Sequence, residues 1–329
     1  MSLLQKIREK ASRQKKTIIL PEAEKDIRVI RAALELQKNG LAEPVLLGSR
    51  EVILNLATDH NETVPDEVVI TPYSDNATED EKYEFFKEKL KHKNLDKSQL
   101  LELCNNPLFT AGWMLATGRG DATVAGSVAS TGEVIVSALR TVGVAPGSGL
   151  VSSTFLMEMP DGRVFTYADC AVVPYPDSEQ LASIAVDAGH THRLLAGEEP
   201  VVAFLSFSTK GSARHERVEL VQKAAELAKT KQPDWKMDGE LQFDTAAIAD
   251  IAARKAPDSP VKGSANVFIF PNLDAGNIAY KITERLGGAT ATGPILQGLA
   301  KPYMDLSRGC SVEDIVNTAC VASLLANES

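Results

Sequence analysis

The chain has 329 residues, 44% of them hydrophobic and 24% charged, which suits two globular domains with substantial cores. Its net charge of -9 argues against general nucleic-acid binding, because affinity for a phosphate backbone needs a basic surface. No apolar stretch approaches the about 18 residues of a membrane span, and we expect no signal peptide. The four cysteines form no C-x-x-C pair, so we expect reduced thiols in a cytoplasmic protein.

The N-terminal elements predict a βαβ unit. After a short amphipathic helix at 2–13, a buried strand is expected at 17–21 and a helix at 26–39, closed by Gly40. The next strand is expected at 44–48. Strand, helix and strand within about thirty residues favour a parallel sheet.

Further elements follow along the chain, with a Pro-, Gly- and Ser-rich segment at 144–149 as a domain boundary. The stretch from Leu296 to the last helix is expected to be a loop. Helices are expected at 79–93, 107–117, 178–195, 215–229, 277–286 and 311–326, and another, carrying Arg140, after residue 132. Strands are expected at 121–125, 150–157, 164–167, 201–207 and 267–270.

The run from Asp305 to Asp314 predicts an anion site at the start of the last helix. Gly309 allows a sharp turn, the helix start supplies unpaired N–H groups, and Arg308 adds a permanent positive charge. Asp314 follows Ser307 by seven residues and would be able to face the same cleft. The alternative is a capping box, in which Asp314 only satisfies the helix end.

Three other loops combine hydroxyl, amide or glycine residues after a strand. Such loops gather at the carboxyl ends of strands, where open α/β sheets bind ligands. Each also has a purely structural interpretation, as a tight turn, a helix cap or a polar surface loop. None matches a dinucleotide-binding or ATP-binding glycine motif. The candidate substrate-binding residues in these loops are Ser127, Ser130, Thr131, Ser208, Lys210, Asn272 and Asn277.

Several motifs together resemble the phosphate acetyltransferase (phosphotransacetylase) family over nearly the whole chain. The stretches 211–215 and 306–312 are most similar to the ethanolamine-utilisation branch. The most specific segments are Ser206–Ala213, Asp238–Gln242, Lys255–Pro257, Asn266–Pro271, Gly276–Lys281 and Asp305–Ser311.

The resemblance implies a two-domain α/β fold like that of the isocitrate and isopropylmalate dehydrogenases, with the active site in the cleft between the domains. The implied bounds are 1–145 with 297–329 for one domain and 146–296 for the other. The implied reaction is acetyl-CoA plus phosphate to acetyl phosphate plus CoA, with no cofactor or metal. The resemblance also implies a homodimer, and it adds Arg140 and Lys281 to the substrate-binding residues.

The resemblance assigns roles to three residues. Asp314 matches the general base that takes the proton from the CoA thiol. Ser307 matches the serine that stabilises the tetrahedral oxyanion, and Arg308 matches the arginine that holds the phosphoryl group.

Two positions depart from the family pattern. Many relatives carry an arginine where this chain has Leu90, just before Lys91-His92-Lys93, and another where it has Val136. Both arginines serve anion or CoA contacts in the family. Arg140 lies one helical turn after Val136 and would partly substitute for the missing charge.

Three alternatives remain at this point. A longer acyl group, propionyl or butyryl, would replace acetyl without changing the chemistry. A metal-dependent dehydrogenase-like relative would need clustered aspartates, which the sequence does not show. A non-catalytic binding protein would fit the two missing arginines but not the retained Ser307, Arg308 and Asp314 set.

Overall fold

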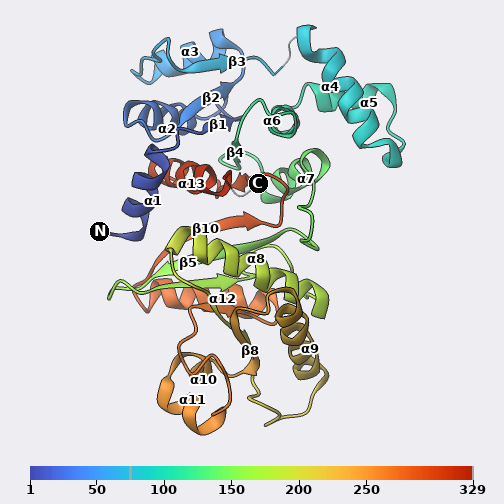
Figure 1. Cartoon of the computed structure of the whole chain (residues 1–329). Coiled ribbons are helices and arrows are strands. Elements are labelled where there is room, and N and C mark those ends of the chain that lie inside the picture. The colour runs from blue at the N-terminus through green and yellow to red at the C-terminus, as the bar shows by residue number, and fades with distance from the viewer. Residues whose placement is uncertain (74–75, 328–329) are drawn as a thin grey trace. The chain divides into compact units, whose positions relative to one another are not determined.

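The computed structural model describes residues 1–73 and 76–327 (Figure 1). The chain forms two compact units, the first made of 1–143 and 299–329 and the second of 144–298. The predicted boundaries, after residues 145 and 296, each lie two residues from these. The first unit is therefore discontinuous in sequence.

The first unit is built on a parallel five-stranded sheet in the order β11-β4-β1-β2-β3. The predicted βαβ unit is present, since β1 and β2 pair in parallel with Ile18 opposite Pro44. The last strand in the chain, β11, pairs with β4 and forms one edge. The strands are β1 (Thr17–Leu20), β2 (Glu43–Leu47), β3 (Val69–Thr71), β4 (Ala122–Ala125) and β11 (Tyr303–Asp305).

Helices cover both faces of this sheet. Side chains alternate along a strand, so Ile19 points to one face and packs with α6 and α7, while Ile18 and Leu20 point to the other. There α2 and α13 pack against the strands, and α1 packs on α13. The helices are α1 (Leu3–Ser12), α2 (Ile27–Lys38), α3 (Arg50–Asp59), α4 (Asn76–Lys89), η1 (Lys91–Lys93), α5 (Lys97–Cys104), α6 (Pro107–Ala116), α7 (Thr131–Thr141) and α13 (Val312–Leu325).

The second unit is built on a mixed six-stranded sheet in the order β10-β5-β6-β9-β7-β8. The β10, β5 and β6 strands pair antiparallel, and the pairs from β6 through β9 and β7 to β8 are parallel. The strands are β5 (Ser152–Glu158), β6 (Val164–Ala168), β7 (Val201–Leu205), β8 (Lys236–Leu241), β9 (Val267–Ile269) and β10 (Thr290–Gln297).

Two apolar cores lie on opposite faces of this second sheet. One packs alternate strand residues such as Val202 and Phe204 under α8 and α9. The other packs Ala203 and Phe268 against α10 and α12. Figure 1 shows α12 running along β5 and β10, which it contacts. The helices are α8 (Ser178–Ala196), α9 (Glu216–Lys231), α10 (Phe243–Ala247), α11 (Ala249–Lys255) and α12 (Leu273–Arg285).

The structure differs from the sequence-based prediction at these places, among others. The stretch after Leu296 is not all loop, because it holds the end of β10 and the strand β11. The helix expected at 277–286 begins at Leu273, because Asn272 caps it by accepting from Ala275 N at 3.0 Å. The helix expected at 79–93 ends at Lys89. A separate 3₁₀ turn follows it and ends at Asn94, which has a left-handed φ of 50°.

Candidate functional site

The residues proposed from the C-terminal run lie on one turn of the first unit. Strand β11 ends at Asp305, and Leu306 N donates to Ala125 O at 2.8 Å. The chain then turns, with Cys310 N donating to Ser307 O at 2.9 Å and Gly309 N donating to Ser307 Oγ at 3.3 Å. Ser307 and Arg308 are exposed to solvent on this turn, which leads directly into α13.

Asp314 forms the capping box that the sequence offered as the alternative. Its Oδ2 accepts from Ser311 N at 2.8 Å and from Ser311 Oγ at 2.9 Å, while Asp314 N donates back to Ser311 Oγ at 3.1 Å. The side chain is nevertheless exposed. A carboxylate that is oriented by two donors and open to solvent is able to accept a proton, so capping does not preclude a role as a base.

The loop after β4 already holds an anion of its own. Glu22, at the end of β1, is 6% exposed, and its carboxylate accepts from five donors. Oε2 accepts from Gly126 N and Ser127 N at 2.8 Å and from Ser127 Oγ at 3.0 Å; Oε1 accepts from Val128 N at 3.1 Å and Ala129 N at 2.7 Å. These N–H groups are therefore not free to cradle a phosphate.

The two hydroxyls at the end of this loop also have internal partners. Ser130 caps α7 in a capping box with Glu133, whose Oε2 accepts from Ser130 Oγ at 2.7 Å. Thr131 Oγ1 donates to Asp305 Oδ2 at 2.6 Å. Ser130 thus has the structural role that the sequence offered as the alternative, and Thr131 joins α7 to the end of β11.

Asp305 is an unusual carboxyl at the base of the site. It is 3% exposed, and burial raises its pKa to about 6, with the charge of Glu22 also raising it and the Thr131 hydrogen bond lowering it. Its Oδ1 is buried without a hydrogen-bond partner among the described residues. Gly126, at φ +105°, packs so closely that an added Cβ would lie 2.5 Å from this oxygen, so only glycine fits there.

The two positions that depart from the family pattern line one pocket of the first unit. Leu90 and Val136 both face a cavity of about 410 Å³ beside η1 and α7. Arg140 lines the same cavity, which confirms that it shares a face with Val136. The remaining lining residues are Lys89, His92, Lys93 and Leu139. The pocket is basic even without the two arginines.

The candidate loop residues of the second unit are tied to their own neighbours. Ser208 is fully buried, and its Oγ donates to Glu240 Oε1 at 2.8 Å. Lys210 Nζ donates to the buried Asp238 Oδ1 at 2.6 Å. These contacts build the loop after β7, so a ligand there would have to compete with an internal ion pair.

The candidates near α12 are arranged differently. Asn272 is used as the cap of the helix, and Asn277 Nδ2 donates to Cys170 O at 3.0 Å. Lys281 lies one turn further along and is exposed, with its Nζ 5.1 Å from the centre of the Tyr280 ring. Lys281 therefore keeps a charge available to solvent, whereas the amide groups mainly hold the backbone together.

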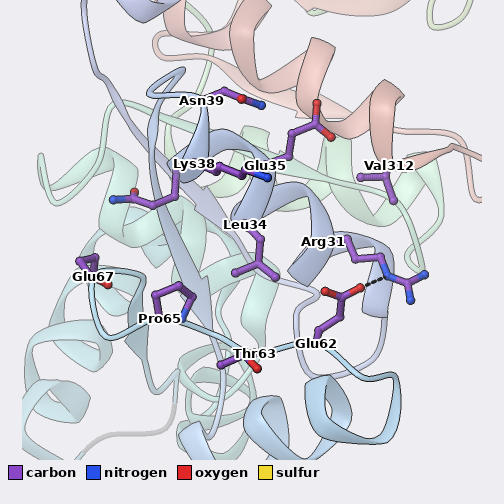
Figure 2. Close-up of a pocket in the computed structure, with 11 residues that line it drawn as sticks. Arg31, Leu34, Glu35, Lys38, Asn39, Glu62, Thr63, Pro65, Glu67 and Val312 are labelled. Carbon is purple, nitrogen blue, oxygen red and sulfur yellow. Dashed lines mark hydrogen bonds and ion pairs between the residues drawn. The ribbon is translucent and has the colours of Figure 1, made fainter.

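A larger pocket of about 890 Å³ lies elsewhere on the first unit and contains none of the predicted site residues (Figure 2). Leu34 and Pro65 line it, together with charged side chains of α2 and of the chain after α3. Its charges are partly paired internally, since Arg31 Nε donates to Glu62 Oε1 at 2.8 Å.

Sequence reasoning missed Glu22 as a site residue. Its partners follow it by 104 to 107 residues, so no local spacing shows the contact. The only signal is its place directly after a buried strand and a proline.

Within residues 1–73 and 76–327, no helix is long and apolar enough to cross a membrane. In the same part of the chain, no group of three or more His, Cys, Asp or Glu side chains is placed to hold a metal ion.

Comparison with known proteins gives consistent matches over the whole chain. The family model described as Phosphate acetyl/butaryl transferase matches residues 2–323. A phosphate acetyltransferase of Acetivibrio thermocellus is 45% identical over 332 residues, which cover 99% of this chain and 98% of the relative.

Solved structures agree with this match. A phosphotransacetylase from Streptococcus pyogenes has a TM-score of 0.94 at 38% identity, with 99% of this chain and 98% of that chain covered. The EutD phosphotransacetylase from Staphylococcus aureus has a TM-score of 0.90 at 39% identity, with 98% of each chain covered.

A more distant structure shows the fold alone. A protein described as a 4-hydroxythreonine-4-phosphate dehydrogenase from Salmonella typhimurium is 13% identical, with a TM-score of 0.56 over 94% of this chain and 99% of that chain. The predicted dehydrogenase-like α/β fold class is thereby confirmed.

Proposed function

Because the chain belongs to the Phosphate acetyl/butaryl transferase family, we propose that it reversibly transfers an acetyl group between CoA and inorganic phosphate. The family predicted from the sequence is confirmed by relatives named phosphate acetyltransferase at 40 to 45% identity over almost the entire chain. The observation that carries the proposal is this full-length similarity, together with the presence of Ser307, Arg308 and Asp314 on one exposed turn and helix start.

Asp314 is the proposed base. It removes the proton from the CoA thiol, because the thiolate is the nucleophile. The sulfur attacks the carbonyl carbon of acetyl phosphate, a C–S bond forms, and the negative charge moves to the carbonyl oxygen. The tetrahedral intermediate then collapses, the C–O bond to the phosphoryl group breaks, and phosphate leaves. No covalent bond to the protein forms at any step.

Ser307 and Arg308 stabilise the charges that develop. The Ser307 hydroxyl donates to the oxyanion of the tetrahedral intermediate. The Arg308 guanidinium binds the phosphoryl oxygens as a planar donor with a permanent charge. Both side chains are exposed on the turn, which supports contact with a ligand from solvent.

The basic pocket with Arg140 is a proposed contact for the phosphates of CoA. Three cationic residues support this assignment, Lys89, Lys93 and Arg140, since cations attract phosphate groups. Lys281 is a second exposed cation that we retain as a substrate contact. Ser127, Ser130, Thr131, Ser208, Lys210, Asn272 and Asn277 remain proposed binding residues, although their described hydrogen bonds support a role in shaping the loops.

We also propose a homodimer. Three large apolar side chains follow one another at four-residue spacing on α12 and its C-cap: Ile278, Ile282 and Leu286, which are 57%, 52% and 85% exposed. Such a stripe is typical of a helix whose apolar face packs against a partner. Light scattering after size exclusion tests this, and an Ile282→Glu variant is expected to shift the mass towards the monomer.

Two further expectations complete the proposal. The reaction needs no metal or prosthetic group, so chelation followed by dialysis should leave the rate unchanged. A cytoplasmic location is supported by four free cysteines, which suit a reducing compartment.

The decisive experiment supplies acetyl, propionyl and butyryl phosphate with CoA and follows thioester formation. The highest kcat/KM is expected with acetyl phosphate. Turnover that is fastest with butyryl phosphate would instead favour the other acyl group in the family description, and no turnover with any donor would contradict the proposed reaction.

Two variants test the mechanism in the same assay. Ser307→Ala is expected to lower kcat on the order of 10²-fold, the loss typical of one oxyanion donor. Asp314→Asn keeps a capping side chain but removes the base, so a near-normal kcat across pH would refute the base assignment.

A further inference from the structure

The guanidinium of Arg28 joins the two loops that carry the candidate residues of the first unit. Its Nη1 donates to Arg308 O at 3.0 Å and to Cys310 O at 2.6 Å. Its Nη2 donates to Ser127 O at 3.1 Å, on the loop after β4. These carbonyls lie 280, 282 and 99 residues away in sequence, so one side chain of α2 connects three distant points of the chain.

Asp26 fixes the orientation of this guanidinium. Its Oδ1 accepts from Arg28 Nε at 3.0 Å, and its Oδ2 accepts from Arg28 Nη2 at 2.7 Å. Asp26 also caps α2, with Oδ1 accepting from Arg28 N at 2.9 Å. Burial raises the pKa of Asp26, but the side-chain and backbone hydrogen bonds from Arg28 outweigh this and leave the pKa below its usual value.

The same peptide groups that accept from Arg28 donate to the proposed catalytic side chains. A trans peptide is planar, so its C=O and N–H point in opposite directions. The peptide whose carbonyl belongs to Arg308 carries the N–H of Gly309, which donates to Ser307 Oγ at 3.3 Å. The peptide whose carbonyl belongs to Cys310 carries the N–H of Ser311, which donates to Asp314 Oδ2 at 2.8 Å.

We propose that Arg28, oriented by Asp26, is a positioning residue for the acyl transfer. It holds two peptide planes so that their N–H groups orient Ser307 Oγ and the Asp314 carboxylate. It acts through the backbone and touches no reacting atom. This inference rests on the proposed function, and it adds residues to the reaction that the motif resemblance does not assign.

The expected kinetic effect falls on kcat. Misplacing a reacting group by about 1 Å costs on the order of 10²-fold in rate, so Arg28→Ala is expected to lower kcat by 10- to 100-fold. The KM for CoA should change by less than about threefold, since the proposed role of Arg28 is exerted through the backbone. Arg28→Lys keeps the charge but not the forked donors, so it should recover only part of the rate.

A second variant avoids the loss of the arginine itself. Asn caps helices as well as Asp, so Asp26→Asn preserves the start of α2 while it removes the charge that orients Arg28. This variant should fold and still lose kcat at least fivefold. The matched control is Arg31→Ala, on the same helix, which loses only the ion pair with Glu62 shown in Figure 2 and should keep kcat within twofold.

A double-mutant cycle separates positioning from a general structural role. Because Arg28 is proposed to act through both Ser307 and Asp314, adding Arg28→Ala to a Ser307→Ala, Asp314→Asn background should lower kcat by less than threefold more. If the role of Arg28 were merely structural, Arg28→Ala would lower kcat by the same factor in that background as in wild type. Hydrogen exchange of the peptide covering 306–311 should quicken in Arg28→Ala, while exchange at the centre of α13 stays unchanged.

The outcomes separate this inference from the proposed function. A wild-type protein without acyl transfer would overturn the function itself. A wild-type protein with full activity, combined with Asp26→Asn and Arg28→Lys variants within twofold of its kcat, would leave the function intact and overturn the positioning role. Equal losses from Arg28→Ala in the wild-type background and in the Ser307→Ala, Asp314→Asn background would also overturn it.

Discussion

Replacing Glu22 with glutamine should destabilise the first unit by removing acceptors from a buried loop. The carboxylate has two acceptor oxygens that serve five donors, four of them backbone N–H groups. Glutamine has only one acceptor oxygen. Its NH₂ group would occupy the place of the second carboxylate oxygen and would face N–H donors there. In either orientation, two backbone N–H groups lose their acceptor.

The magnitude follows from these contacts. A buried donor left without an acceptor costs about 1–3 kcal/mol, so two of them reduce the free energy of unfolding by about 2–6 kcal/mol. The matched control is Glu133→Gln, which is exposed and sits in a capping box that accepts Glu or Gln equally. That variant should leave the free energy of unfolding almost unchanged.

The chain offers a direct optical assay for this unit. Its two tryptophans are Trp113, which is buried in the first unit, and Trp235, which lies in the second. In a Trp235→Phe background, fluorescence during guanidinium chloride unfolding reports on the first unit alone. If Glu22→Gln unfolds within about 1 kcal/mol of its parent, the loop does not depend on this carboxylate and the reasoning is refuted.

Three further predictions concern charge. The pKa of Asp305 is raised to about 6 from 3.8, so the stability that its protonated form contributes is complete below pH 3.8 and is lost as the pH rises through 6. Asp305→Asn does not titrate, so its free energy of unfolding relative to wild type should rise by about 3 kcal/mol across that window, as measured by chemical unfolding. Burial lowers the pKa of His192 to about 4 from 6.5, so the stability that its neutral form contributes is complete above pH 6.5 and is lost as the pH falls through 4. The free energy of unfolding should therefore fall by about 3 kcal/mol in wild type but not in His192→Gln, as measured by Trp235 fluorescence during unfolding. Val136→Arg should lower the KM for CoA several-fold in the acyl-transfer assay, and an unchanged KM would show that the basic pocket does not bind that substrate.

The regular elements of the first βαβ unit were predictable because their sequence pattern is local. Apolar runs at 17–20 and 44–47 flank an amphipathic helix with a cap at Asp26, and each signal lies within a few residues. Strand β11 gave no such signal. It has three residues and ends in a charged one, and it is a strand only because β4 pairs with it.

Strand β8 was missed for a related reason. Its residues Asp238 and Glu240 are charged yet buried, which contradicts the usual apolar pattern of a buried strand. Lys210 and Lys229 pair with Asp238, and Ser208, Gly211 and Gln222 donate to Glu240. These partners come from other elements, so the pattern is intelligible only in three dimensions.

The site shows the same division between local and distant information. The turn at Gly309 and the cap formed by Asp314 were predictable from spacing within ten residues. The N–H groups of the loop after β4 are not free to bind a phosphate, because Glu22 already accepts from them. Glu22 lies about a hundred residues earlier in the chain, so no local pattern shows this contact. Likewise, Arg28 gave no sign of its connection to the C-terminal turn.

The position of β11 at the edge of the first sheet bears on how the protein is made. A ribosome releases residues 144–298 as one continuous segment, so the second unit has all its strands before synthesis ends. The first 143 residues must wait, because their sheet lacks β11 and their core lacks α13 until residues 299–329 emerge. The N-terminal part therefore spends most of translation with an unpaired β4 edge, and a nascent chain that stalls before Tyr303 has neither a finished sheet nor the turn that bears Ser307.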